Sequence, residues 1–297
     1  MGARAAPFDK MGSMGASYWN QVLADGLAVP SDRPLDDLTA DLTRMLGSTD
    51  PAQRDGTAYP ALTTWIDRGV YDDLLTGLGD GMAAGLRVGL GEQGTDSVFR
   101  RAFSVRVLAR CVARDNEHGL VTDATVLGWG DRIVTWLLRE RDVRGHVPGK
   151  GWAHAIAHGA DAIGALAASS HLGAPELTVL LDVLADRVLL PVDRVLTSGE
   201  PDRAARATMA VLRRDVLPMA LLEPWVGRLA AAAAPTDSVD DSPTSDPFLA
   251  TGNAESFLRA LYLQVALGTP APDVRSDLLL VLVDALRASN QHFLRPR

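Results

Sequence analysis

One short stretch of the sequence, GKGWAHAIAHGAD at residues 149–161, concentrates residue types that can do chemistry. His154 and His158 are four residues apart, and Asp161 follows three residues after His158. On a helix that turns by about 100° per residue, these three side chains would share one face within about 60°. Such a stripe suits acid–base chemistry, metal binding or a polar seam between packed helices.

Acid–base chemistry assigns a role to each member of this stripe. His158 would donate or accept the proton, because an imidazole changes its charge near neutral pH. Asp161 would orient His158, and His154 would help to position an anionic substrate. We therefore take His158, Asp161 and His154 as the candidate catalytic residues.

Metal binding would use the same two histidines, because His154 and His158 have the spacing of a chelating pair on a helix. Asp161 lies seven residues after His154, about 10.5 Å along a helix axis, so one ion would take two of the three and further ligands from another helix. Ala155 stands where zinc proteases have a glutamate, which argues against that reaction class. A divalent metal at His154 and His158 is thus allowed, and the sequence requires no cofactor.

The residues that precede the stripe add charge. Lys150, one of only two lysines in the chain, lies in a Gly-Lys-Gly loop before a predicted helix, where backbone N–H groups can hold an anion. We predict that Asp142, Arg144, Lys150 and Trp152 bind a small anionic molecule, and His146 is close enough to join them. The loop lacks the flanking pattern of a P-loop.

The structural alternative is a buried polar seam. Helical arrays tie their layers together with buried His–Asp hydrogen bonds, because buried polar groups need partners. Gly159, in the middle of the predicted helix, costs about 0.5–1 kcal/mol relative to alanine and indicates a close helix crossing. An open stripe would favour a functional site, and a stripe covered by a neighbouring helix would favour a seam.

Helical periodicity runs through most of the chain. Leu35, Leu38, Leu42 and Leu46, for example, recur at steps of three and four residues. About a dozen helices joined by short polar turns, without a convincing alternating strand, predict an all-α, HEAT-like array of stacked helical hairpins. A compact irregular bundle is the rival architecture. The helix that carries the histidine stripe is expected to span residues 151–170.

We divide the chain into an N-terminal tail with a first helix, at residues 1–30, and a single helical-repeat-like domain, at residues 31–297. Residues 235–247, PTDSVDDSPTSDP, are acidic and almost free of apolar side chains, so they are predicted to form a flexible surface loop. Cys111 is the only cysteine, so it has no intrachain disulfide partner, and we expect it in the core of a helix.

The composition limits the classes of partner. The 297 residues carry a formal net charge of -8, which disfavours binding to nucleic acid or to an anionic membrane. No run approaches the roughly 18–20 apolar residues of a membrane span, and the N-terminal residues lack a signal peptide, so we expect a cytoplasmic protein. The remaining partners are a small-molecule ligand or another protein, and the oligomeric state is left open.

Four segments resemble a known family. They are DPAQRDGTAYPALTTWI (50–66), DSVFRRAFSVRVLA (96–109), RDVRGHVPGKGWAHAIAHGAD (141–161) and NAESFLRALYLQVAL (253–267). In this order, over roughly residues 35–290, they resemble the bacterial domain-of-unknown-function family 2785. The resemblance implies an all-helical, HEAT-like fold and implies no activity.

Two function classes are therefore expected. In the first, the protein binds or transforms a small, anionic molecule in a polar pocket around residues 142–161, by acid–base or metal-assisted chemistry. In the second, it is a non-catalytic interaction scaffold, and the His/Asp motif holds its helices together.

Overall fold

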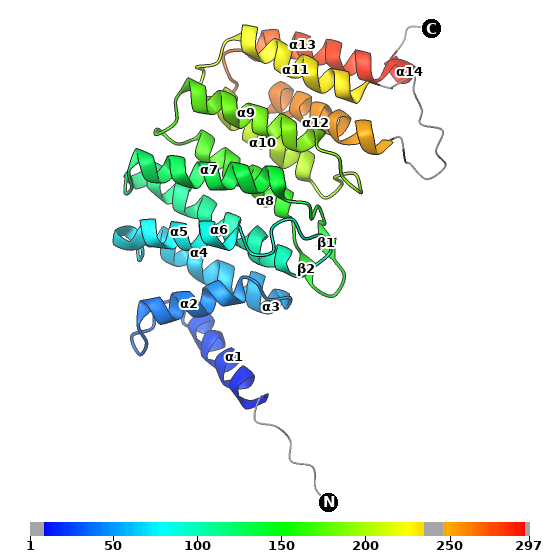
Figure 1. The fold of residues 1–297 in the computed structure, drawn as a ribbon. Coiled ribbons are helices and arrows are strands. Elements are labelled where there is room, and N and C mark those ends of the chain that lie inside the picture. Colours follow the sequence, from blue (N-terminus) through cyan, green and yellow to red (C-terminus); the bar gives the residue numbers. More distant parts are fainter. Residues whose placement is uncertain (1–8, 235–245, 247, 295–297) are drawn as a thin grey trace, which may run out of the picture.

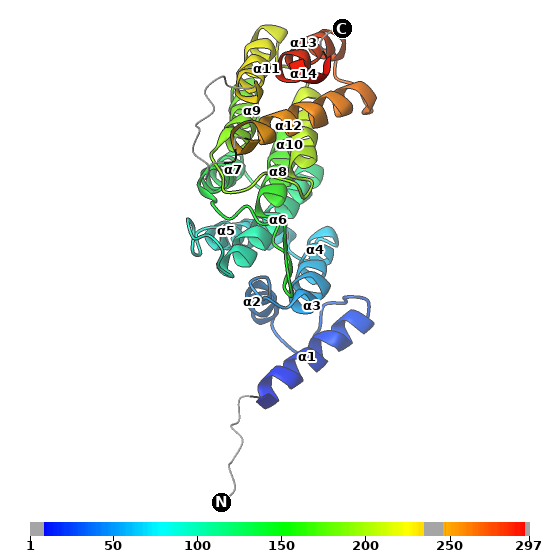
Figure 2. The same ribbon diagram turned by 90° about the vertical axis from the view of Figure 1, so that its right-hand side faces the viewer.

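The computed structural model describes residues 9–234, 246 and 248–294. The regular secondary structure of these residues is almost entirely helical, which confirms the all-α prediction. The helices stack in two layers along one long axis, with α1 (Asp9–Ala24) at one end and α13 (Arg275–Ser289) at the other (Figures 1 and 2). The assignment of this stack to the HEAT class stays a prediction.

Each layer is a row of helices that follow one another along the axis (Figure 2). The first layer consists of α2 (Leu35–Met45), α5 (Leu75–Gly85), α7 (Asp123–Arg139), α9 (Ala174–Leu189) and α11 (Met219–Ala233). The second layer consists of α4 (Tyr59–Asp67), α6 (Ser97–His118), α8 (Ala155–Ala167), α10 (Glu200–Leu212) and α12 (Phe248–Leu267). The short helical elements are α3 (Pro51–Gln53), the π-helix η1 (Arg54–Ala58), the 3-10 helix η2 (Asp72–Leu74) and α14 (Gln291–Leu294).

Helix α8 lies in the middle of the second layer, between α6 and α10. Its buried face is built largely from alanine and glycine, so its neighbours can approach closely. A Cβ atom on Gly159 would lie only 2.6 Å from a methyl carbon of Leu137 in α7. This contact confirms the helix crossing predicted at Gly159.

The segment before α8 forms a short hairpin instead of helix. Strand β1 (His146–Val147) pairs antiparallel with β2 (Gly151–Trp152), and His146 faces Trp152 across the pair. The predicted helix over 151–170 is therefore too long, because α8 begins at Ala155 and ends at Ala167. Gly149 and Gly151 both have positive φ angles, 74° and 78°, which a right-handed helix does not allow.

A continuous hydrophobic core runs along the stack from Trp19 in α1 to Ala285 in α13. Cys111 is buried in α6, as predicted. The predicted flexible loop at 235–247 lies outside the described residues, apart from Asp246. Among the helices that the structure describes, none has the length and apolar character needed to cross a membrane.

Candidate functional site

A buried arginine, Arg54, holds the hairpin in place. Its Nη1 donates a hydrogen bond to the Ser48 carbonyl oxygen at 2.7 Å, and its Nη2 donates to the Lys150 carbonyl oxygen at 2.8 Å. The guanidinium also lies over the ring of Phe99, 4.2 Å from its centre. Arg54 begins the π-helix η1, an element that is frequent near functional sites. The hairpin is thus anchored to η1.

His154 joins the hairpin to α8 in a conformation that few side chains adopt. Its φ angle of 53° lies in the left-handed region. Its ring stacks on the exposed ring of Trp152, with centres 4.2 Å apart, and its backbone N–H donates to the Arg144 carbonyl oxygen. The Nε2 atom of His154 is buried and has no hydrogen-bond partner among the described residues. Because unpaired buried nitrogens are rare and costly, this atom is a candidate contact for a ligand.

His158 is buried one turn further along α8 and packs against α6, so this part of the stripe is covered by a neighbouring helix, as the seam alternative predicts. Its Nδ1 lies 3.2 Å from the Ala102 carbonyl oxygen of α6, and Nδ1 must carry the proton because a carbonyl oxygen only accepts. The ring meets Phe103 and His154 edge-on, with centres 5.4 and 5.9 Å away. The neutral ring fixed in this way keeps a lone pair on Nε2.

Burial and nearby arginines keep both imidazoles neutral. Burial lowers the pKa of His158 well below its ordinary value of 6.5, and the charges of Arg106 and Arg203 lower it further. The pKa of His154 is also lowered, first by burial and then by Arg203, while the Ser198 backbone opposes this change. Near neutral pH, both rings are therefore neutral and can accept hydrogen bonds.

Asp161 does not orient His158, so this part of the acid–base prediction is wrong. The two carboxylate oxygens of Asp161 accept hydrogen bonds from Arg203 and Arg206 of α10. His158 faces α6 instead, where the Ala102 carbonyl oxygen orients its ring. The two side chains are neighbours on the surface of α8 but point toward different helices.

Arginines surround the two histidines on the second layer. Arg106 of α6 lies 3.9 Å from the carboxylate of Asp55. Arg203 and Arg206 share the single carboxylate of Asp161. The charges of Arg106 and Arg203 help to lower the pKa of both histidines, so these arginines make the potential at the two rings more positive.

The positive potential also bears on metal binding. The part of the chain that the structure describes contains no group of three or more His, Cys, Asp or Glu side chains that could hold an ion. His154 and His158 alone would supply two nitrogens, and Arg106 and Arg203 would repel a cation from them. An anion therefore fits these surroundings better than a divalent metal, and a metal at His154 and His158 stays a prediction.

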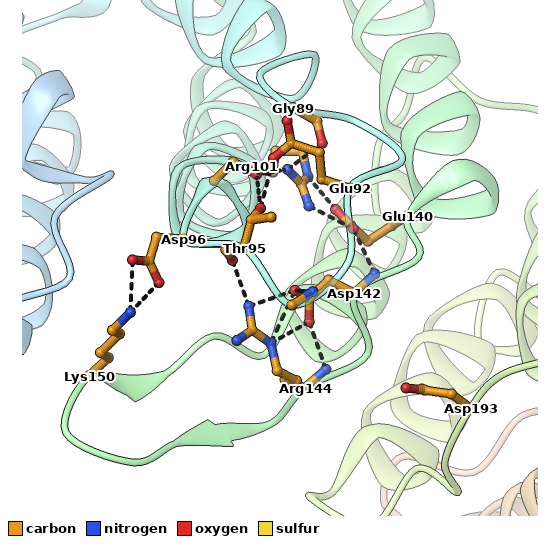
Figure 3. A network of polar contacts seen from close by, with 12 residues as sticks. Gly89, Glu92, Thr95, Asp96, Arg101, Glu140, Asp142, Arg144, Lys150 and Asp193 are labelled. Carbon is orange, nitrogen blue, oxygen red and sulfur yellow. Dashed lines mark hydrogen bonds and ion pairs between the residues drawn. The ribbon is translucent and has the colours of Figure 1, made fainter.

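The residues before the hairpin form an internal network of ion pairs (Figure 3). Asp142 is fully buried, accepts a hydrogen bond from the Gly94 backbone N–H at 3.0 Å, and forms a two-point ion pair with Arg144. Glu140, two residues earlier, forms a buried ion pair with Arg101. Both carboxylates are thus satisfied within the protein.

Lys150 and Trp152 lie on the hairpin itself. The Nζ atom of Lys150 is 2.6 and 2.7 Å from the two carboxylate oxygens of Asp96 (Figure 3). Trp152 is 46% exposed and meets the ring of His146 edge-on, with centres 5.1 Å apart. The three charged members of the predicted ligand-binding set thus have partners inside the protein, whereas Trp152 is open to solvent.

Comparison with known proteins identifies a family. The model of the family described as "Protein of unknown function (DUF2785)" matches residues 86–263, more than half of the chain. The chain belongs to this family. Neither the curated proteins nor the solved structures that were compared include a match.

The DUF2785 match contains both histidines, Asp161, and the arginines of α6 and α10 that surround them. Arg54 lies before the matched range, so the resemblance of segment 50–66 stays a prediction. The structure nevertheless joins this segment to the family region. Arg54 lies over Phe99 and donates to the Lys150 carbonyl oxygen, so three of the four resembling segments meet at the hairpin.

The arginines around the histidines were not predicted from the sequence. Arg203 and Arg206 are three residues apart and share one face of α10, and Arg106 lies within the resembling segment 96–109. These spacings are typical of any exposed helix face. The stacking order of α6, α8 and α10 is what brings the arginines to the histidines.

Proposed function

We propose that a small anion carrying hydroxyl groups binds on the second helix layer, beside the hairpin. The residues concerned, called the histidine site below, are Arg106, Trp152, His154, His158 and Arg203. The observation that carries the proposal is that two imidazoles on one face of α8 lie near two arginines, the pKa of each ring being lowered first by burial and further by Arg106 and Arg203.

The histidine site offers complementary hydrogen-bonding groups. Arginine side chains only donate, so Arg106 and Arg203 suit a phosphate or carboxylate group. Neutral imidazole nitrogens accept, so the unpartnered Nε2 of His154 suits a hydroxyl group of the same ligand. The exposed ring of Trp152 supplies an apolar wall beside them.

The same geometry supports proton transfer. His158 holds its proton on Nδ1 against the Ala102 carbonyl oxygen, which leaves Nε2 as the basic nitrogen. A ligand hydroxyl that reaches this atom could give up its proton there, while the arginines stabilise the negative charge that develops. This role makes His158 the general base of the proposed site.

A second candidate function is an interaction scaffold. The pairing of Asp142 with Arg144 and of Lys150 with Asp96 favours it, because this half of the motif holds the hairpin to the helices. In that case the exposed Trp152 would contact a protein partner.

We also infer a cytoplasmic location. The single cysteine, Cys111, is buried as a free thiol. A reducing compartment suits a chain with one free cysteine.

Calorimetric titration with ribose 5-phosphate tests the histidine site. The wild-type protein should bind this probe more tightly than inorganic phosphate, because its hydroxyl groups can reach the imidazole nitrogens. Arg106→Gln and Arg203→Gln should each weaken binding at least about tenfold, equal to about 1.4 kcal/mol. Binding should also change the fluorescence of Trp152, and a Trp152→Phe variant should lose that signal.

Arg132→Gln is the matched control, because Arg132 is an exposed, ion-paired arginine on α7 in the other layer. It should bind ribose 5-phosphate as the wild type does. Undetectable binding to the wild type, or equal binding to Arg203→Gln and Arg132→Gln, would contradict the proposal.

A further inference from the structure

Two adjoining cavities lie at the loop ends of the first layer, on the other side of the hairpin backbone from the histidine site. Their volumes are about 620 and 420 Å³, and both are lined by Gln93 and Asp193. Their walls come from the loop after α5, and from the last turns of α7 and α9 with the loops that follow them. We call the two together the arginine cleft. Each volume lies within the range of about 300–1,000 Å³ that is typical of small-molecule sites. Each cavity is therefore larger than a single small anion needs.

Arginines outnumber carboxylates along this cleft. Its lining includes five arginines and three acidic residues, the arginines being Arg139, Arg141, Arg144, Arg187 and Arg194. The acidic residues are already paired: Glu140 with Arg101, Asp142 with Arg144, and Asp193 with Arg194. Figure 3 shows Asp193 across from the Asp142–Arg144 pair. The cleft is therefore positive within a chain whose net charge is -8.

Arg139 and Arg141 carry much of the uncompensated charge. Arg139 ends α7 and Arg141 lies two residues beyond it; both are exposed, and neither has a hydrogen bond or ion pair with another described residue. They flank Glu140, whose side chain points inward to Arg101. The backbone becomes extended at Glu140, directly after α7, and the acid points into the core while both arginines line the cleft.

Arg187 adds a donor that the protein leaves unused. Its side chain is only 4% exposed, and its Nη1 donates to the Glu140 carbonyl oxygen at 2.8 Å. Its Nε atom, however, has no hydrogen-bond partner among the described residues. Burial lowers the pKa of Arg187 to about 10, with Glu140 opposing the change, so the group remains a cation near neutral pH. A buried, unpaired N–H on a cation favours contact with an oxyanion.

We propose that the arginine cleft binds a small organic molecule that carries a diphosphate group. Two exposed arginines and one buried arginine match the charge of roughly three that a diphosphate bears near neutral pH, and the planar guanidinium fork fits phosphate oxygens at two points. Leu138, Leu190 and Pro191 line the same cleft and supply an apolar wall for the organic part. This site is distinct from the histidine site and does not depend on it.

The hairpin backbone separates the two sites. The Ala153 N–H donates to the Gly145 carbonyl oxygen at 2.9 Å, and the His154 N–H donates to the Arg144 carbonyl oxygen at 3.2 Å. The Arg144 side chain turns to Asp142 and the cleft, whereas the His154 ring turns to Trp152. Variants on one side should therefore leave binding on the other side unchanged.

Calorimetric titration with inorganic pyrophosphate, at constant ionic strength, tests the arginine cleft. Wild-type protein should bind pyrophosphate at least about tenfold more tightly than inorganic phosphate or citrate. The double variant Arg139→Gln/Arg141→Gln should lose at least about tenfold in affinity for pyrophosphate. Because both side chains are exposed, the melting temperature without ligand should stay close to that of the wild type.

Arg132→Gln/Arg228→Gln is the control, since it removes the same charge from two exposed arginines of the first layer. It should keep wild-type affinity for pyrophosphate, and so should Arg203→Gln in the histidine site. Absence of pyrophosphate binding to the wild type, equal binding of citrate, or equal losses in the two double variants would overturn the proposal.

Discussion

At His158, a single ring shows how the surroundings of a residue decide its chemistry. Burial favours the neutral form, and the charges of Arg106 and Arg203 favour it further. The Ala102 carbonyl oxygen then selects which nitrogen holds the proton. A histidine that the sequence marks as a catalytic candidate is therefore held as a neutral acceptor, with no contribution from Asp161.

The substitution His158→Ala tests this environment. It should lower the free energy of unfolding by about 1–3 kcal/mol, because the buried Ala102 carbonyl loses its partner and a small cavity opens beside Phe103. Asp161 should add little to the loss, since it keeps both of its arginines. Urea denaturation near pH 7.5 measures the difference. A change below about 0.5 kcal/mol would show that the ring contributes no stability in this position.

At the scale of the element, α8 owes its position to small residues. Gly159 faces α7, where Leu137 and Trp136 lie too close for a Cβ atom, at 2.6 and 3.1 Å. Gly164, five residues later, faces Ala207 of α10, and a Cβ atom there would lie 3.6 Å from the nearest atom, an ordinary contact distance. The two glycines thus occupy the same helix in different packing environments.

This difference predicts opposite effects of one substitution at two positions. Gly159→Ala should destabilise the protein by about 1–3 kcal/mol, because the added methyl group overpacks the crossing with α7. Gly164→Ala should be neutral or stabilise it by up to about 1 kcal/mol, because alanine favours the helix and the methyl group fits. Chemical denaturation of the two variants provides the comparison. Equal effects at both positions would mean that the crossing at Gly159 is not tight.

At the scale of the whole molecule, the histidines couple stability to pH in opposite directions. His154 and His158 have pKa values lowered below 6.5, chiefly by burial. His171, between α8 and α9, bridges Asp123 and Asp115, and its hydrogen bond to Asp123 is the main cause of its raised pKa. The free energy of unfolding near neutral pH therefore depends both on histidines with a lowered pKa and on one with a raised pKa.

The signs of these contributions follow from linkage. For His154 and His158, the unfolded chain binds protons more readily than the folded one, so their contribution is present above pH 6.5 and is lost as the pH falls below it. For His171, the contribution is present below pH 6.5 and is lost as the pH rises through its raised pKa.

Denaturation at pH 5.5 and 7.5 should therefore separate the two kinds of histidine. The stability difference between the wild type and His158→Ala should shrink at the lower pH. The reason is that protonation of His158 in the unfolded chain stabilises the unfolded state, while the folded state keeps the ring neutral. The difference between the wild type and His171→Asn should grow, because protonated His171 gains from both carboxylates. Parallel changes in both variants would argue against these opposite shifts.

The sequence by itself determined the local structure well. Periodic leucines such as Leu38 and Leu42 are fully buried on one face of α2, as their spacing predicts. Gly159 lies at a close helix crossing, and Cys111 lies in the core of α6. These features follow from the helical repeat, because residues three and four positions apart lie on the same face of a helix. The hairpin was not predicted, because its strands are only two residues long and are too short to show the alternation of apolar and polar residues that marks a strand.

Only the tertiary structure decided which partner each charged side chain takes. Asp161 pairs with Arg203, Lys150 with Asp96, and the Lys150 carbonyl oxygen with Arg54, over separations of 42 to 96 residues. No periodicity relates residues so far apart in the chain. Their pairing depends on which helices become neighbours in the stack and on where each side chain points, and both are set by packing of the whole core.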